Sequence, residues 1–105
     1  GESGLLVTAT ARASTAGLTK SLARELARYG IRANCVSIAL VQTENFGAHA
    51  GGLDEERMQK LVAQYPLRRL GRPEDVTAMV LLLASPLSSW TTGQVVSVNG
   101  GYAMP

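Results

Sequence analysis

In the first third of the chain, apolar side chains form a continuous run, then recur at helical spacing, and then form a second strand-like stretch. Residues 5–7 form a short aliphatic run after a serine and a glycine, which predicts a buried strand. Residues 13–29 predict a helix, because apolar side chains recur at helical spacing. These side chains are Leu18, Leu22, Leu26 and Tyr29. Gly30 is expected to end this helix in a left-handed conformation, and residues 31–38 follow as a second strand.

The remainder of the chain predicts two more helices and a last strand. Asp54 is a suitable cap for a helix that ends at Pro66 and has one apolar face. This face comprises Met58, Leu61, Val62 and Tyr65. Pro73 is a favourable first residue for another helix. Its expected core face comprises Val76, Met79, Val80 and Leu83. Residues 94–98 predict the last strand.

The resulting order is β-α-β-α-α-β. A strand, a helix and a strand joined by so short a turn are typical of a parallel crossover unit, so we predict an α/β fold with a parallel sheet. Residues 44–52 are small and polar and include three glycines, which predicts a mobile loop before the second helix.

Composition and charge narrow the classes of protein. With 105 residues, of which 46% are hydrophobic and 17% charged, the chain is expected to form one folded domain rather than to remain disordered. The net charge of +2 is not concentrated anywhere, so we expect no nucleic-acid partner. The longest apolar runs, such as residues 79–84, are far below the roughly 20 residues that cross a bilayer, so we expect no membrane partner.

Cysteine and histidine usage indicates the compartment and argues against a metal site. The single cysteine, Cys35, cannot form an internal disulfide, and the first residues lack the basic start of a signal peptide, so we expect a cytoplasmic protein. His49 has no second histidine, cysteine or carboxylate cluster nearby, so we expect no metal site.

Four stretches of the chain carry a family resemblance. They occur in family order and with family spacing: residues 18–26, 29–34, 66–76 and 92–101. With them the chain resembles the C-terminal half of a short-chain dehydrogenase/reductase, and most closely the branch that reduces 3-oxoacyl thioesters or dehydrogenates alicyclic alcohols. The resemblance implies a partial Rossmann-like sheet, the C-terminal half of a doubly wound fold. It also implies NAD or NADP as cofactor and interconversion of carbonyl and alcohol groups.

The glycine-rich turn of the family is missing from these residues. Family members hold the dinucleotide pyrophosphate with that turn and a helix N-terminus. Gly51 and Gly52 have the wrong spacing for it. We therefore expect residues 1–105 to be a single C-terminal half-domain, without the dinucleotide-binding half, so that cofactor binding by this chain alone is in doubt.

The tyrosine and the lysine that move the proton in this family are also missing. Counting back along the first helix places their positions at Thr8 and Arg12. A threonine is a far weaker acid than a phenol, and an arginine stays protonated. A second register puts residues 3–7 on the family's fifth strand and Thr10 at the position of the catalytic serine. Both registers leave the chain without the proton donor.

The segment after the second strand keeps part of the family's nicotinamide-binding pattern. Val41 and Thr43 match the valine and threonine that hold the nicotinamide carboxamide in the family. Ile38 and Ala39 stand where the family has a proline and a glycine, so the rigid and sterically open pair is replaced.

Half a sheet needs a partner. The first strand would expose a hydrogen-bonding edge, so we expect a homo-oligomer or a complex with a complementary half or subunit. The resemblance implies dimer contacts through the helix at residues 13–29. Two functions remain open. The chain is either a piece of an NAD(P)-dependent oxidoreductase that is inactive alone, or a non-catalytic assembly subunit that keeps the family's interface surfaces.

Overall fold

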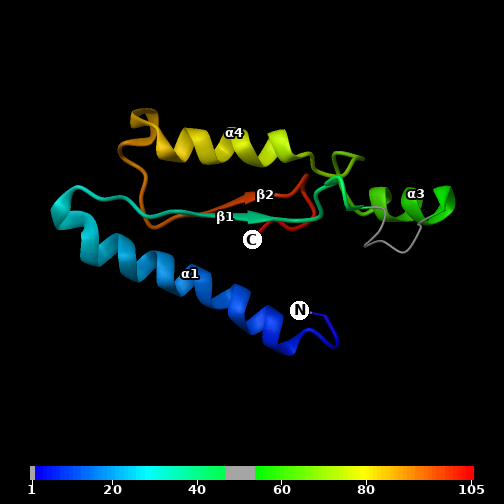
Figure 1. The fold of residues 1–105 in the computed structure, drawn as a ribbon, viewed down its shortest axis with the longest axis horizontal. Coiled ribbons are helices and arrows are strands. Elements are labelled where there is room, and N and C mark those ends of the chain that lie inside the picture. Colours follow the sequence, from blue (N-terminus) through cyan, green and yellow to red (C-terminus); the bar gives the residue numbers. More distant parts are fainter. Residues whose placement is uncertain (1, 47–53) are drawn as a thin grey trace. The chain divides into compact units, whose positions relative to one another are not determined.

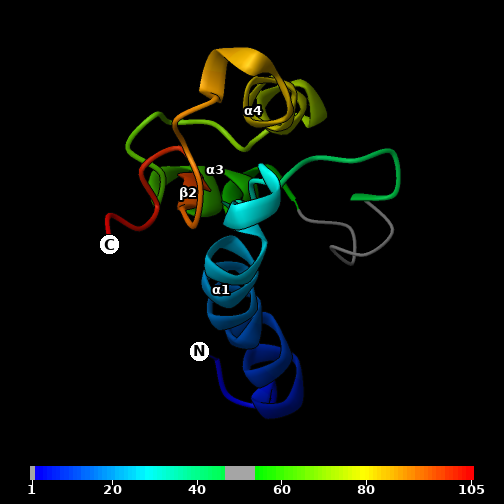
Figure 2. The same ribbon diagram turned by 90° about the vertical axis from the view of Figure 1, so that its left-hand side faces the viewer.

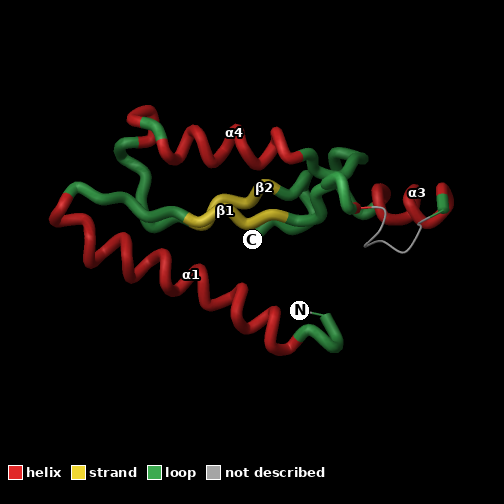
Figure 3. The backbone as a smooth tube through the Cα atoms, viewed as in Figure 1, coloured by secondary structure: helices red, strands yellow, loops and turns green. Residues whose placement is uncertain are grey.

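The computed structural model describes residues 2–46 and 54–105 of the chain. Figure 1 labels the helices and strands, and Figure 3 separates them by type. In chain order they are α1 (Leu6–Leu26), the 3₁₀ helix η1 (Ala27–Tyr29), β1 (Cys35–Ile38), α3 (Glu55–Ala63), α4 (Pro73–Ala84), the 3₁₀ helix η2 (Pro86–Ser88) and β2 (Val95–Val98). The two strands pair and run in the same direction, which confirms an α/β fold with a parallel sheet.

The chain divides into two compact units. The first unit comprises Gly1–Cys35 and Leu83–Val96, and the second comprises Val36–Leu82 and Ser97–Pro105. Each unit is formed by two stretches that are far apart in the sequence. Contacts between two separate stretches of the chain therefore hold each of them together.

The predicted strand at residues 5–7 is wrong. Leu6 and Val7 begin α1, which starts seven residues before the predicted helix. The Ala9 amide donates to the Leu5 carbonyl at 2.7 Å. A three-residue strand with no neighbour leaves its backbone groups unpaired, whereas a helix pairs them locally. The local hydrogen bonds therefore decide the conformation of these aliphatic residues.

The end of the first helix follows the prediction. The α-helix ends at Leu26 and continues as η1 to Tyr29. Gly30 then adopts a φ of 71° and donates its amide to the Ala27 carbonyl. A residue with a Cβ is strained in this left-handed conformation, so the glycine ends the helix and reverses the chain toward β1.

Strand β1 is shorter than predicted, because the preceding residues pair with a loop instead of with a strand. The Arg32 guanidinium donates to the Ser88 hydroxyl and to the carbonyls of Ser85 and Thr91 at 3.0–3.2 Å. The Asn34 side chain donates to the Thr91 carbonyl and accepts from the Gln94 amide. These side chains hold the first unit together around η2.

In the second unit, α3 begins as predicted, but it ends before Tyr65, which was predicted to lie on its apolar face. The Asp54 carboxylate accepts a hydrogen bond from the Arg57 amide at 2.8 Å, which is a helix N-cap. The helix ends at Ala63, and Tyr65 follows with only 4% of its surface exposed. The Tyr65 ring lies 5.1 Å from the Tyr102 ring, centroid to centroid. The last residues of the chain are thus packed against the turn after α3.

Helix α4 lies along one side of the strand pair, as Figures 1 and 2 both show. Pro73 is its first residue, and Glu74 and Asp75 occupy its first turn. Val76 and Met79 are half-buried, as expected for a core face, but Val80 is 48% exposed. The prediction that Val80 belongs to the core is therefore wrong.

Few apolar side chains are buried among the described residues. The buried apolar side chains are Ala23, Tyr65 and Leu70. Trp90, which follows η2, is 99% exposed, and Leu87 is 87% exposed. The parallel pair consists of β1 and β2, so one edge of β1 has no strand beside it within the described part of the chain.

None of the helices in residues 2–46 and 54–105 is both long enough and apolar enough to cross a membrane.

The Arg32 contacts predict a stability effect. Arg32→Lys removes the planar fork that reaches three acceptors, so it is expected to lower the free energy of unfolding by about 1–3 kcal/mol. Urea denaturation followed by circular dichroism measures this change. Arg24→Lys, at an exposed position of α1, is the matched control and is expected to change little. Equal effects of the two substitutions would contradict the role of Arg32.

Candidate functional site

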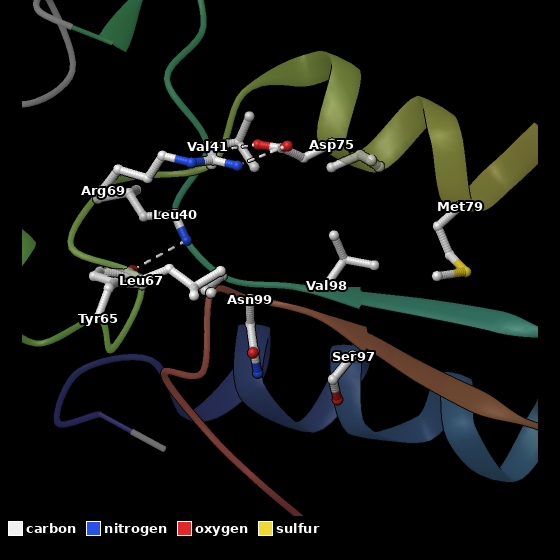
Figure 4. A pocket seen from close by; sticks show the side chains of 14 residues that line it. Leu40, Val41, Tyr65, Leu67, Arg69, Asp75, Met79, Ser97, Val98 and Asn99 are labelled. Atoms are coloured by element: carbon white, nitrogen blue, oxygen red, sulfur yellow. Dashed lines mark hydrogen bonds and ion pairs between the residues drawn. The ribbon is translucent and has the colours of Figure 1, made fainter.

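The second unit contains a cavity of about 300 Å³ beside the backbone that leaves β1. Leu40 and Val41 line it on one side, the stretch from Tyr65 to Gly71 on another, and α4 and the end of β2 complete it. Figure 4 shows Val98 pointing toward α4, while Ser97 and Asn99 point to the other side of the strand. The cavity wall is therefore built largely from apolar side chains and from backbone.

Three hydrogen bonds hold the segment after β1. The Leu40 amide donates to the Tyr65 hydroxyl at 3.3 Å, and the Gly71 amide donates to the Leu40 carbonyl at 3.0 Å. The Gln42 amide donates to the Gly71 carbonyl at 2.9 Å. Val41 and Gly71 form an isolated parallel bridge through the latter two bonds. Residues 40–42 are thus extended and held in place.

Gly71 is required by this close approach. A Cβ built on Gly71 would lie 3.2 Å from Cγ2 of Val41 and 3.3 Å from the Leu40 carbonyl oxygen. Both distances are tighter than ordinary van der Waals contact. A side chain at this position would push the segment after β1 away from its present path.

The backbone groups of Val41 itself remain available. Its amide and its carbonyl have no hydrogen-bond partner within residues 2–46 and 54–105, because the bridge uses the groups of Leu40 and Gln42. Successive backbone groups in extended chain face opposite sides, so those of Val41 are directed away from Gly71. The Thr43 side chain is exposed two residues further on.

A second, apolar groove lies next to these two residues. It has a volume of about 390 Å³. It is lined by Ile38, Val41, Thr43, Pro73, Val76, Thr77, Val80 and Leu81. The Val41 backbone and the Thr43 hydroxyl offer one donor, one acceptor and one group that does both, which is the set that a primary carboxamide needs. The apolar groove beside them suits a flat, weakly polar ring.

An ion pair closes the turn in front of α4. Nη1 and Nη2 of Arg69 lie 2.6 and 2.9 Å from the two carboxylate oxygens of Asp75, as Figure 4 shows. The Arg72 amide also donates to this carboxylate, at 2.8 Å. The hydrogen bonds from Arg69 and Arg72 lower the pKa of Asp75 well below its usual range. The same pair raises the pKa of Arg69.

The three candidate proton-transfer residues all lie in α1, in the first unit. Thr8 and Arg12 are exposed and one helical turn apart, so they share a face of the helix. Thr10 donates its hydroxyl to the Leu6 carbonyl at 2.7 Å. The register that made Thr10 a catalytic residue needs a strand at residues 3–7, where the structure has a turn and the start of α1. A catalytic role for Thr10 stays a prediction without that strand.

Two expectations fall on residues outside the described part of the chain. His49 and most of the predicted mobile loop at residues 44–52 belong to residues 47–53. Within the described ranges, no group of three or more histidine, cysteine, aspartate or glutamate side chains is placed to hold a metal ion.

Sequence reasoning missed the residues that hold the site. Tyr65 was expected on the apolar face of a helix, and its hydroxyl gave no hint of a contact with Leu40. Gly71 was part of a recognised stretch, but its pairing with Val41 joins residues 30 positions apart. A signal did exist, because a tyrosine among aliphatic positions brings a hydroxyl that needs a partner when it is buried.

A family model and many known proteins match this chain. The model described as Enoyl-(Acyl carrier protein) reductase matches residues 2–103. The acetoacetyl-CoA reductase of Synechocystis is 42% identical over 92 residues, which cover 87% of this chain and 37% of that protein. The 3-oxoacyl-[acyl-carrier-protein] reductase of Aquifex aeolicus is 44% identical over 92 residues, with 88% of this chain and 36% of that protein covered.

Solved structures of short-chain dehydrogenases and oxidoreductases also match this chain. A short-chain oxidoreductase from Pseudomonas aeruginosa, described as NADPH-bound and as containing an atypical catalytic center, matches with a TM-score of 0.87 and 35% identity. The match covers 99% of this chain and 41% of that one. The chain thus spans little more than a third of the length of the curated relatives that it matches.

The depressed pKa of Asp75 predicts how stability depends on pH. A carboxylate whose pKa is lower in the folded state stabilises the fold above its unfolded pKa of about 4, and this contribution is lost as the pH falls toward the folded pKa. Asp75→Asn keeps an acceptor for the Arg72 amide but removes the charge. We expect it to lower the melting temperature at pH 7.

The difference between Asp75→Asn and the unmodified chain is expected to shrink below pH 4. Thermal melts followed by circular dichroism between pH 2.5 and 7 measure it. Glu74→Gln, in the same first turn of α4, is the control for the loss of one exposed negative charge. A constant difference across this pH range would contradict the assignment.

Proposed function

Because the chain belongs to the short-chain dehydrogenase/reductase family, we propose that it is a piece of an NAD(P)-dependent oxidoreductase that interconverts carbonyl and alcohol groups. In this proposal Val41 and Thr43 bind the nicotinamide carboxamide, and the chain is inactive on its own. The relatives that reduce acetoacetyl-CoA and 3-oxoacyl carriers support a 3-oxoacyl thioester as the substrate class.

The open backbone of Val41 carries the proposal. An amide donor and a carbonyl acceptor are held in extended chain by the bridge to Gly71, beside an exposed threonine and an apolar groove. A primary carboxamide has two donors and one acceptor, so it can pair with Val41 in both directions and still reach Thr43. The residues present therefore fit the nicotinamide end of the cofactor.

NAD(P)H supplies the hydride when it is bound. The Val41 backbone orients the carboxamide and thereby the plane of the ring, and the Thr43 hydroxyl adds a third contact. Apolar side chains of α4 in the groove, among them Val76 and Val80, keep water from one side of the ring.

Inactivity of the lone chain rests on Thr8 and Arg12. They stand at the positions of the family's tyrosine and lysine, and a positioned general acid contributes roughly 10²–10⁴-fold to such reactions. Neither a threonine hydroxyl nor a guanidinium releases a proton readily near neutral pH. The Pseudomonas relative, described as NADPH-bound and as containing an atypical catalytic center, supports the idea that cofactor binding and an altered catalytic center occur together.

Association with another chain is the second part of the proposal. Large apolar side chains are exposed in both units, and the outer edge of β1 is unpaired within the described residues. The exposed apolar side chains include Leu6, Val7, Leu18, Ile38, Val80, Leu81, Leu87 and Trp90. Exposed apolar surface and an open strand edge both favour a partner. The same surfaces support the alternative function, a non-catalytic assembly subunit.

The carboxamide contact is tested with reduced nicotinamide mononucleotide, which lacks the adenosine half. We expect titration to shift the amide resonances of Val41 and Thr43 in ¹H–¹⁵N spectra. Thr43→Val is expected to weaken binding about three- to tenfold through the loss of one hydrogen bond. Thr15→Val, at an exposed position of α1 outside the groove, is the matched control and is expected to bind as the unmodified chain does. Saturating addition without shifts at Val41 and Thr43 would refute the proposal.

Association and activity are separated in one mixing experiment. The chain is combined with the part of the Aquifex aeolicus reductase that it does not match, and size-exclusion chromatography with light scattering is run at micromolar concentration. We expect a complex or a homo-oligomer. A well-folded monomer in both samples would contradict the need for a partner.

NADPH oxidation with acetoacetyl-CoA is then measured on the same samples. An increase over the reductase part alone supports a piece of an oxidoreductase. A stable complex without any increase supports the assembly subunit instead.

A further inference from the structure

We propose that Tyr65 is a positioning residue for nicotinamide binding: its hydroxyl fixes the Leu40 amide and thereby the orientation of the Val41 backbone. This inference rests on the proposed function, because it concerns the same carboxamide contact. It assigns a role to a side chain that is not itself proposed to touch the carboxamide.

The position of the Tyr65 hydroxyl is determined by the packing of its ring. The ring is 4% exposed and lies 5.1 Å from the Tyr102 ring. On another side the backbone of Gly100 approaches so closely that a Cβ built there would lie 3.4 Å from Cδ1 of Tyr65. The Leu67 amide donates to the Gly100 carbonyl, which ties the turn after Tyr65 to the end of β2. A ring held on these sides leaves its hydroxyl little freedom.

The hydroxyl acts on the Leu40 amide, which Gly71 does not hold. Gly71 pairs with the Leu40 carbonyl and with the Gln42 amide. Tyr65 accepts from the Leu40 amide at 3.3 Å and so fixes the peptide between Ala39 and Leu40, as Figure 4 shows for the side chains concerned. Both ends of the Val41 backbone are then set, one by Tyr65 together with Gly71 and the other by Gly71.

The hydrogen bond between Leu40 and Tyr65 is important because the residues before Leu40 do not restrict the backbone. Ile38 and Ala39 stand at the family's proline and glycine, so no proline ring restricts φ before Leu40. Without the Tyr65 contact, the Leu40 side of the bridge, which orients the Val41 amide, would be held by the bond from Gly71 alone. The hydrogen bond that the Leu40 amide donates to the buried Tyr65 side chain replaces the lost covalent restriction.

A positioning role differs from a purely structural one in what it changes. Loss of the hydroxyl should increase the opening of the Leu40 amide and weaken the nicotinamide contact, while the thermal stability of the chain changes little. A purely structural tyrosine would lower the melting temperature and leave ligand binding by the folded protein unchanged.

The experiment uses the whole chain and two phenol-to-phenyl substitutions. Tyr65→Phe removes the hydroxyl and keeps the ring. Tyr102→Phe removes the hydroxyl of the other ring of the pair and is the matched control. We expect Tyr65→Phe alone to speed hydrogen exchange of the Leu40 amide about two- to tenfold, as the loss of one net hydrogen bond implies. Its dissociation constant for reduced nicotinamide mononucleotide should rise by a similar factor.

A second variant approaches the same bond from the donor side. Cys35 permits ligation of a synthetic segment of residues 35–105, in which Leu40 is replaced by its α-hydroxy acid analogue. This ester linkage removes the amide donor, keeps the side chain and leaves Tyr65 intact. We expect the same weakening of binding, and no further weakening when Tyr65→Phe is added. This variant also decides the question if Tyr65→Phe does not fold.

The outcomes separate the two proposals. If the unmodified chain binds reduced nicotinamide mononucleotide and the Tyr65→Phe and ester variants bind it equally well, the role of Tyr65 is refuted and the carboxamide contact stands. If the unmodified chain shows no binding at Val41 and Thr43, the proposed function fails, and this inference fails with it. Additive losses from Tyr65→Phe and the ester would also overturn the direct coupling of the two groups.

Discussion

Hydrogen bonds from side chains to backbone hold the segments next to the two strands, and the rest of the structure depends on them. A parallel pair of two four-residue strands satisfies few backbone groups, and groups left unpaired away from water are costly. Arg32 and Asn34 supply the missing partners before β1, and Tyr65 supplies one after it. These contacts reach between parts of the chain that are remote in sequence.

The same constraint places the candidate site. Parallel strands leave their last residues at one edge of the sheet, where the following backbone has no ladder to join. In this chain Gly71 extends the pairing by one bridge beyond β1, and this bridge uses only the groups that face it. The groups of Val41 on the opposite side have no partner among residues 2–46 and 54–105. An extended segment held on one side and free on the other is well suited to bind a planar amide.

Exposure of apolar surface connects the fold with the question of function. Both candidate functions need a partner, and both units expose aliphatic or aromatic side chains that water solvates poorly. In the proposed function, Val41 and Thr43 of the second unit bind the nicotinamide, and Thr8 of the first unit takes the position of the family's proton donor. The proposal therefore assigns ligand contacts and proton transfer to different units of the chain.

Local patterns were sufficient for most of the elements. The cap at Asp54, the proline at the start of α4 and the left-handed Gly30 are decided by neighbouring residues, and the structure confirms all three. The strand predicted at residues 5–7 is wrong because its formation is not decided by neighbouring residues alone. A strand depends on a neighbour that the pattern does not contain, whereas a helix pairs its own backbone.

By itself, the sequence determined the helices, the family and the positions of Val41 and Thr43 along the chain, because these follow from periodicity, capping and recognised stretches. Only the tertiary structure decided which backbone groups near Val41 are used and which are free. That distinction depends on Tyr65 and Gly71, which lie 25 and 31 positions from Leu40 in sequence. Pairing over such distances is set by the packing of rings and glycines in space, and no local pattern encodes it.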